Sequence, residues 1–159
     1  MPSHMPSVLF VCTGNICRSP TAQALLQHKA AALGLQVTTD SAAVTTEEVG
    51  NPPDRRALAE LRRRGVPMPD HRARQVRDED FTAFDLVLGM TAHHVHALER
   101  MAPAHATARI GLLMDHADGP RARDVPDPWY GGQQEFVEAF DMIEAGVEGL
   151  LHQHKARGR

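Results

Sequence analysis

Both cysteines of the 159-residue sequence lie in one short stretch near its start. This stretch reads VCTGNICRSP from Val11 to Pro20 and contains Cys12 and Cys17. A zinc site would need further ligands at matching spacing, and a structural disulfide normally joins distant parts of a chain. We therefore interpret one of the two sulfurs as chemically reactive.

The residues on either side predict an anion site at Cys12. The apolar run at 7–12 (SVLFVC) is typical of a strand buried in a parallel sheet, and Ser19 followed by Pro20 is typical of a helix N-cap and first turn. A loop between a strand end and a helix N-terminus directs backbone N–H groups and the positive end of the helix dipole at one point. We expect Cys12 to be a thiolate there at neutral pH, with Arg18 adding a positive charge.

These groups suit nucleophilic attack on a phosphate monoester. The thiolate of Cys12 would attack phosphorus, the guanidinium of Arg18 would bind two equatorial oxygens, and a covalent thiophosphate would form. The cradle for the phosphate would be built from the loop residues Thr13, Gly14, Asn15, Ile16 and Cys17.

Strand-like and helix-like segments alternate along the chain. Apolar strand candidates occur at 7–12, 36–43, 84–89 and 108–114, and helical patterns follow at 19–33, 55–64, around 95–101 and from 136 to the C-terminal region. This alternation predicts an α/β three-layer sandwich, with an open four-stranded parallel sheet and helices on both faces. Ligands bind at the carboxyl ends of such strands, where Cys12 is expected.

Length and charge limit the classes of function. A chain of 159 residues, 42% of them hydrophobic, predicts one domain, which we place at 7–152. We expect residues 1–6 to be a disordered N-terminus or a cloning remnant and 153–159 to be a frayed basic tail. The net charge of −3 argues against a nucleic-acid partner, and the lack of a long apolar segment argues against a membrane partner. Two cysteines in one loop suit a cytoplasmic, reducing location.

The stretch from 11 to 20 resembles the phosphate-binding loop of the low-molecular-weight protein tyrosine phosphatases, V/F-C-x-G-N-x-C-R-S-P. The resemblance extends from about Ser7 to Leu151. It implies a Rossmann-like phosphatase fold and metal-independent hydrolysis of phosphotyrosine in proteins through a cysteinyl-phosphate, with phosphate or other oxyanions binding in the loop. No cofactor is implied.

The leaving oxygen needs an acid, because a phenolate or alkoxide departs poorly without a proton. The segment DVPDPWYGG, residues 124–132, lies in the one long loop of the chain. The family carries a D-P-aromatic-Tyr motif that supplies the general acid, so the resemblance implies this role for Asp127. Asp124 is the competing candidate, and turn formation is the common role of a proline-flanked aspartate.

The resemblance also implies supporting residues. Asn15 tolerates the left-handed backbone that a phosphate cradle needs, and the family suggests that Ser19, Ser41 and His71 hold it. His71 lies in HRARQ, which resembles the family segment H-x-A-R-Q. Ser19 would in addition donate a hydrogen bond to Cys12 and stabilise it as a leaving thiolate.

Two features of the loop and its rim remain open at the level of sequence. Cys17 either fills space or captures an oxidised Cys12 as a reversible disulfide. At the rim, Glu47 occupies a position where the family usually has an aromatic or large apolar wall, which would favour basic peptides. Trp129 and Tyr130 would supply aromatic surface instead.

Three other functions are compatible with a loop of this kind: an arginine phosphatase, an arsenate reductase and a non-catalytic binding module. The arginine-phosphatase branch of the family typically has Thr where this chain has Ile16, which favours phosphotyrosine. Arsenate reductases share the fold and loop but use additional cysteines. A phosphate-binding or phosphopeptide-binding module would need neither Cys12 nor Asp127.

Two polar clusters suggest other partners. His93, His94 and His96 could suggest a metal, and the Arg62–Arg64 run could attract nucleic acid. Because the histidines do not share one helical face, and because the chain is acidic overall, we expect both clusters to be solvated helix surfaces with no metal bound.

Overall fold

The structure, a computed structural model, describes residues 5–157 and contains one four-stranded parallel sheet. The strands lie in the order β2-β1-β3-β4, and the four parallel strands confirm the predicted sheet. Their bounds are β1 Val8–Cys12, β2 Thr39–Ala43, β3 Leu86–Gly89 and β4 Arg109–Leu112. Within these residues no helix is long and apolar enough to cross a bilayer.

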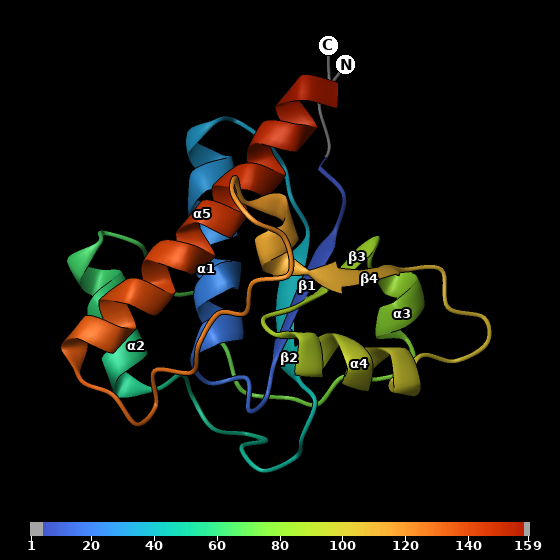
Figure 1. Ribbon diagram of the computed structural model, residues 1–159, viewed down its shortest axis with the longest axis horizontal. Helices are drawn as coiled ribbons and strands as arrows, with labels where there is room; N and C mark the ends of the chain where they lie inside the picture. Colours follow the sequence, from blue (N-terminus) through green and yellow to red (C-terminus); the bar gives the residue numbers. More distant parts are fainter. Residues whose placement is uncertain (1–4, 158–159) are drawn as a thin grey trace.

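Helices cover both faces of the sheet, which confirms the three-layer architecture (Figure 1). On one side lie α1 Arg18–Ala32, α2 Arg55–Arg63 and α5 Gln133–Arg157. On the other side lie α3 Asp80–Ala83 and α4 Ala92–Met101. A single 3₁₀ turn at Leu113–His116 follows β4.

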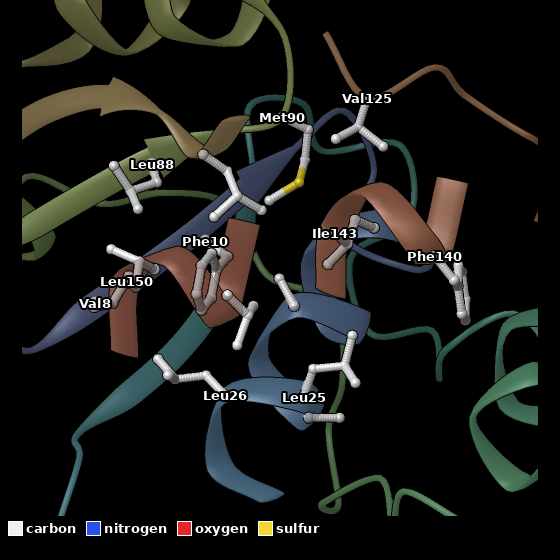
Figure 2. Packing of buried hydrophobic residues seen from close by; sticks show 14 of the residues in the cluster. Val8, Phe10, Leu25, Leu26, Leu88, Met90, Val125, Phe140, Ile143 and Leu150 are labelled. Atoms are coloured by element: carbon white, nitrogen blue, oxygen red, sulfur yellow. The ribbon is translucent and has the colours of Figure 1, made fainter. Parts of the chain in front are cut away.

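The two faces of β1 explain the two hydrophobic layers. Val8 and Phe10 point to one side and pack with α1 and α5, as Figure 2 shows, whereas Leu9 and Val11 pack on the side of α3 and α4. All five residues of β1 are buried because the strand is central and covered on both faces. The prediction that this apolar segment is a strand buried in a parallel sheet is therefore confirmed.

The strand order places the end of β1 at a crevice. The chain passes from β1 through α1 to β2 on one side, and then crosses to β3 on the other side of β1. In open α/β sheets the crevice at such a reversal, beyond the carboxyl ends of the strands, is where ligands bind. Cys12 is the last residue of β1, so it lies at this position.

Some boundaries differ from the sequence expectations. The first long helix begins at Arg18 with Cys17 as its N-cap residue, so the prediction of Ser19 as the N-cap was wrong. The four-residue helix α3 was not predicted, and the 3₁₀ turn Leu113–His116 occupies the end of the expected 108–114 strand.

The chain ends also differ. Residues 1–4 lie outside the described part, but Met5, expected to be disordered, is buried, and its N–H lies 3.4 Å from the carbonyl oxygen of Gln36. At the other end α5 includes residues 153–157, where we expected fraying, and 158–159 lie outside the described part.

Candidate active site

Cys12 and Ser19 face each other across the loop between β1 and α1. The Ser19 hydroxyl lies 3.0 Å from Cys12 Sγ, and the Ser19 N–H points to the same sulfur at 3.4 Å. Ser19 Oγ accepts a hydrogen bond from Asn15 Nδ2 at 2.8 Å, and its hydroxyl hydrogen has two acceptors in reach, the sulfur and the more distant Ala42 carbonyl oxygen at 3.5 Å. The Ser19 side chain therefore serves the loop rather than capping the helix, which explains the misplaced N-cap.

Asn15 is the fixed point of the loop. Its φ angle of 61° lies in the left-handed region, and its side chain is fully buried. Asn15 Oδ1 accepts hydrogen bonds from His71 Nε2 at 2.9 Å and from the Arg74 N–H at 3.1 Å. Together with the bond to Ser19, these contacts satisfy both ends of the amide and hold the strained backbone.

Ser41 supports Asn15 only through His71. Ser41 Oγ donates to Gln23 Oε1 at 2.7 Å and lies 3.3 Å from His71 Nε2, and no hydrogen bond joins Ser41 to Asn15 among the described residues. The pKa of His71 is lowered, first by burial, although the Asp40 carboxylate opposes the shift. Ser41 therefore supports Asn15 indirectly, through His71.

Gln23 and the backbone of Arg74 are members of this network that sequence reasoning missed. The Arg74 side chain binds Asp40 and Asp80, with its Nη1 atom 2.9 Å from Asp80 Oδ2, so the chain that carries His71 is anchored on both sides. A signal for Arg74 was present in the HRARQ segment. Nothing local marks Gln23, because a glutamine inside a helix is usually exposed.

Arg18 and Asp127 come from different parts of the chain and meet at the cleft that Cys12 also lines. Arg18 Nη1 donates to the carbonyl oxygen of Val125 at 2.9 Å, and Arg18 Nη2 lies 3.7 Å from Asp127 Oδ2. The Asp127 side chain is 50% exposed, whereas Asp124 Oδ1 accepts from the Ala92 N–H at the start of α4. The structure thus brings Asp127, rather than Asp124, to Arg18.

The Thr13 hydroxyl is bound by His94, a contact that the sequence does not predict. His94 Nδ1 accepts from the Thr91 N–H at 3.1 Å, so the ring proton resides on Nε2, which donates to Thr13 Oγ1 at 2.9 Å. Burial, followed by the charges of Arg18 and His93, lowers the pKa of His94 to about 3. His93 and His96 are exposed as expected, but the expectation of a solvated His94 was wrong.

The remaining loop residues line a cleft of about 270 Å³. Gly14 allows close approach of Glu48, because a Cβ atom there would lie 3.1 Å from Glu48 Cγ. Ile16 lines the cleft, and its carbonyl oxygen accepts from the Asp54 N–H at 2.7 Å. Cys17 is buried, and that burial is the largest cause that raises the pKa of its thiol, with Cys12 adding to the effect.

The rim of the cleft has an acidic and an aromatic part. Glu47 and Glu48 come from the segment after β2, and Trp129 and Tyr130 come from the 124–132 loop. Trp129 is 39% exposed and Tyr130 is 95% exposed. The four predicted groups of residues (nucleophile loop, Arg18, Asp127 and rim) therefore surround one cleft.

The other clusters take different places. No group of three metal-ligating side chains occurs within the described residues. Arg62 and Arg63 are exposed, but Arg64 contacts Glu60, Asp141 and Glu144, so the expectation that this whole run is solvated was wrong for Arg64.

Comparison with known proteins places these features in a family. A family model described as low molecular weight phosphotyrosine protein phosphatase matches residues 7–158. The chain belongs to the low-molecular-weight protein-tyrosine-phosphatase family. It is an enzyme of the protein-tyrosine-phosphatase class, and the cleft at Cys12 is its candidate active site.

Relatives of this phosphatase cover nearly its whole length. The low-molecular-weight protein-tyrosine-phosphatase YfkJ of Bacillus subtilis is 41% identical over 92% of this chain and 94% of that protein. Its crystal structure matches with a TM-score of 0.88 over 98% of both chains. The human low molecular weight phosphotyrosine protein phosphatase is 38% identical over 86% of this chain and 87% of its own. A Drosophila arginine phosphatase matches with a TM-score of 0.89 at 32% identity, over 95% of this chain and 98% of its own.

Proposed function

We propose that this phosphatase hydrolyses phosphotyrosine in proteins, without a metal ion, through a cysteinyl-phosphate intermediate. The observation that carries the proposal is the convergence of Cys12, Arg18 and Asp127 on one cleft, from the first strand, the first helix and a loop more than a hundred residues away. A nucleophile, an anion-binding guanidinium and a carboxylic acid are the groups that the reaction requires.

In the first step the Cys12 thiolate attacks phosphorus, and the bond from phosphorus to the tyrosine oxygen breaks. Asp127, as a carboxylic acid, gives its proton to that oxygen, so tyrosine leaves as a neutral phenol. Backbone N–H groups of residues 13–17 and the guanidinium of Arg18 bind the phosphoryl oxygens. Because Arg18 Nη1 is fixed on Val125, the orientation of the guanidinium is set before substrate binds.

In the second step water attacks the phosphorus of the cysteinyl-phosphate. Asp127, now a carboxylate, takes a proton from the water, and the bond from sulfur to phosphorus breaks to release inorganic phosphate. The Ser19 hydroxyl, which has Cys12 Sγ within 3.0 Å, stabilises the departing thiolate. Ser19 can donate because its oxygen already accepts from Asn15.

The lining of the cleft supports an aromatic phosphate as substrate. Ile16 adds an apolar side chain at the floor, and Trp129 and Tyr130 offer aromatic surfaces at the rim for a phenyl ring. The likeness to a Drosophila arginine phosphatase keeps phosphoarginine as the second candidate substrate. Its recognition would require the carboxylates of Glu47 or Glu48 to contact a guanidinium.

We further propose that residues 7–152 form one phosphatase domain and that the protein acts in the cytoplasm. One sheet with a hydrophobic layer on each face over this range supports the first proposal. Two free cysteines, one of them the proposed nucleophile, support the second, since a reducing compartment keeps thiols available.

The test is hydrolysis of p-nitrophenyl phosphate, of a phosphotyrosine peptide and of a phosphoarginine peptide, in the presence of EDTA and a reductant. We expect turnover of the first two that survives chelation, disappears in Cys12→Ser and falls by roughly a hundredfold or more in Asp127→Ala. Asp124→Ala is the matched control from the same loop and should keep most of the activity. Activity in Cys12→Ser, or phosphate binding without turnover, contradicts the mechanism and favours a binding module or an arsenate reductase.

A further inference from the structure

Arg56 contacts the 124–132 loop from the start of α2. It is the second residue of that helix, whose N-cap Asp54 accepts a hydrogen bond from the Arg56 N–H at 2.8 Å. The Arg56 side chain is 44% exposed, yet two of its guanidinium nitrogens have polar partners. Nε lies 3.3 Å from Asp54 Oδ1, and Nη1 donates to the carbonyl oxygen of Trp129 at 2.9 Å.

The flat faces of the same guanidinium meet two aromatic rings. The central carbon of Arg56 lies 5.0 Å from the centroid of the Trp129 ring and 4.7 Å from that of Phe136. A planar cation near aromatic rings is attracted to both of them. Arg56 thus binds Trp129 twice, at its backbone and at its ring, and joins it to the first turns of α5.

Trp129 is in turn the residue that holds Asp127. Its N–H donates to Asp127 Oδ1 at 3.0 Å, while Asp127 Oδ2 faces Arg18 at 3.7 Å. A shift of Trp129 would therefore move the donor that orients the carboxylate. Arg56 therefore contacts Trp129, and Trp129 contacts Asp127, the proposed general acid.

Few hydrogen bonds join this part of the loop to the rest of the chain. Within the described residues, the bond from Arg56 to Trp129 is the one hydrogen bond that joins residues 126–131 to the rest of the chain. The neighbouring Val125 is fixed by Met90 and Arg18, and Pro128 is buried. The segment is therefore anchored by burial on both sides of Asp127 and by the hydrogen bond from Arg56 at Trp129.

The N-cap residue of α2, Asp54, also contacts the loop that follows Cys12. The N–H of Asp54, the partner of Arg56 Nε, donates to the carbonyl oxygen of Ile16 at 2.7 Å. The start of α2 therefore sets the distance between the loop that carries Cys12 and the loop that carries Asp127.

We infer that Arg56 is a positioning residue for the proposed general acid: by clamping Trp129 it holds the Asp127 carboxylate over the nucleophile. This inference rests on the proposed function, because it gives Asp127 the acid role. A small displacement of a reacting group lowers the rate substantially, so loss of the clamp reduces proton transfer to the leaving group. Lysine cannot replace Arg56 fully, since it lacks the planar fork that stacks on Trp129 and binds its carbonyl together.

The test is the dependence of kcat/KM on the acidity of the leaving phenol, measured with a series of aryl phosphates. The proteins are the parent, Arg56→Ala, Arg56→Lys, Asp127→Ala, the Arg56→Ala/Asp127→Ala double variant and the control Arg55→Ala. Arg55 precedes Arg56 on the same helix, is exposed and has no side-chain hydrogen bond or ion pair within the described residues.

We expect Arg56→Ala to lower kcat/KM by roughly tenfold for phenyl phosphate, a part of what a general acid contributes, and much less for phosphates of acidic phenols. Arg56→Lys should lie between the parent and Arg56→Ala, and Arg55→Ala should match the parent. In the Asp127→Ala background, Arg56→Ala should cause no further loss, because the group it positions is gone. An equal loss across the whole series, or the same loss without Asp127, overturns the inference.

The proposed function can fail separately. If Asp127→Ala itself leaves the leaving-group dependence unchanged, Asp127 is not the acid, whatever Arg56 does. If Asp127→Ala changes that dependence and Arg56→Ala does not, only the clamp is wrong.

Trp129 supplies a second readout, because it is the single tryptophan of the chain. In Arg56→Ala we expect greater quenching of its fluorescence by acrylamide than in the parent or in Arg55→Ala, at unchanged far-UV circular dichroism. Equal quenching in all three proteins shows that Arg56 does not hold Trp129 and contradicts the clamp.

Discussion

His94 Nε2 donates a hydrogen bond to Thr13 Oγ1, the hydroxyl of the residue that follows Cys12. The bond requires a neutral imidazole with its proton on Nε2, because Nδ1 accepts from the Thr91 N–H. A buried histidine on α4 therefore supports the phosphate loop from the opposite side to α1. A Cβ atom on Gly89 would lie 2.8 Å from His94 Cβ, so the close approach of α4 to β3 needs a glycine there.

His94 should make the protein sensitive to acid. Its pKa is about 3 when folded and 6.5 in the reference state, so the folded protein favours the neutral ring. The resulting stability is fully present above about pH 6.5 and is lost as the pH falls toward 3, which amounts to about 2 kcal/mol by pH 5. Urea unfolding at about pH 5 and pH 7.5 should show this loss in the parent and in His93→Gln. The loss should be smaller by about 2 kcal/mol in His94→Gln, where only the part that comes from the lowered pKa of His71 remains. An equal loss in all three proteins contradicts the assignment.

Asn15 allows backbone strain and side-chain bonding to be measured separately. Asn15→Gly keeps the backbone free at φ 61° but removes the bonds to Ser19, His71 and Arg74. Asn15→Ala removes the same bonds and adds the steric cost of a left-handed residue. We expect both variants to lose phosphate affinity, and Asn15→Ala to be about 1 kcal/mol less stable than Asn15→Gly in denaturant unfolding. Equal stabilities show that the loop relaxes to another backbone conformation.

Cys17 should protect Cys12 from irreversible oxidation. Its buried thiol, with a raised pKa, is protonated at neutral pH, and it can condense with the sulfenic acid of Cys12 to form a disulfide and water. After limited hydrogen peroxide, we expect dithiothreitol to restore the activity of the parent but not of Cys17→Ser. Full recovery of both proteins shows instead that Cys17 only fills space in the loop.

Glu47 should favour peptides that carry basic residues beside the phosphotyrosine. It is an exposed carboxylate at the mouth of the cleft, so its effect is modest and screened by salt. We expect Glu47→Gln to reduce the preference for a lysine-flanked over an aspartate-flanked peptide by about two- to fivefold in kcat/KM at low salt. Glu138→Gln, an exposed site on α5, is the control, and no change of preference removes Glu47 from substrate selection.

Arg64 should contribute to stability but not to catalysis. It joins α2 to α5 through Glu60, Asp141 and Glu144, with its Nη1 atom 2.9 Å from Glu144 Oε1. Removal leaves the buried Glu60 with fewer partners, so Arg64→Ala should lower the free energy of unfolding by about 2 to 3 kcal/mol. Arg62→Ala, exposed on the same helix, should have little effect. A loss of kcat in Arg64→Ala at a temperature where it is folded contradicts this purely structural role.

The same carboxylate has a pH signature. The hydrogen bond from Arg63 is the largest cause that lowers the pKa of Glu60, and burial opposes it. Because the folded pKa lies below the reference value of 4.5, this stability is present above about pH 4.5 and is lost as the pH falls below it.

Local patterns sufficed for much of the site. The apolar run before Cys12 and the short loop leading to Pro20 indicated a strand, a loop suited to an anion and a helix, and the structure contains the strand, the loop and the helix in that order. The same patterns were misleading at Ser19, because its side chain has two possible uses and only the neighbouring Asn15 decides between them. They were also misleading at His94, where the helical pattern cannot show which face meets the sheet so closely.

The sequence by itself determined the order of the main elements, the loop after Cys12 and, through a family motif, the choice of Asp127 as the proposed acid. These depend on contiguous residues, whose preferences act over a few positions. Only the tertiary structure decided which distant residues form hydrogen bonds to the residues of the site. Arg74 binds Asn15, His94 binds Thr13 and Arg56 binds Trp129. Such contacts join residues tens of positions apart along the chain, and they exist because the parallel sheet brings separate loops to one edge.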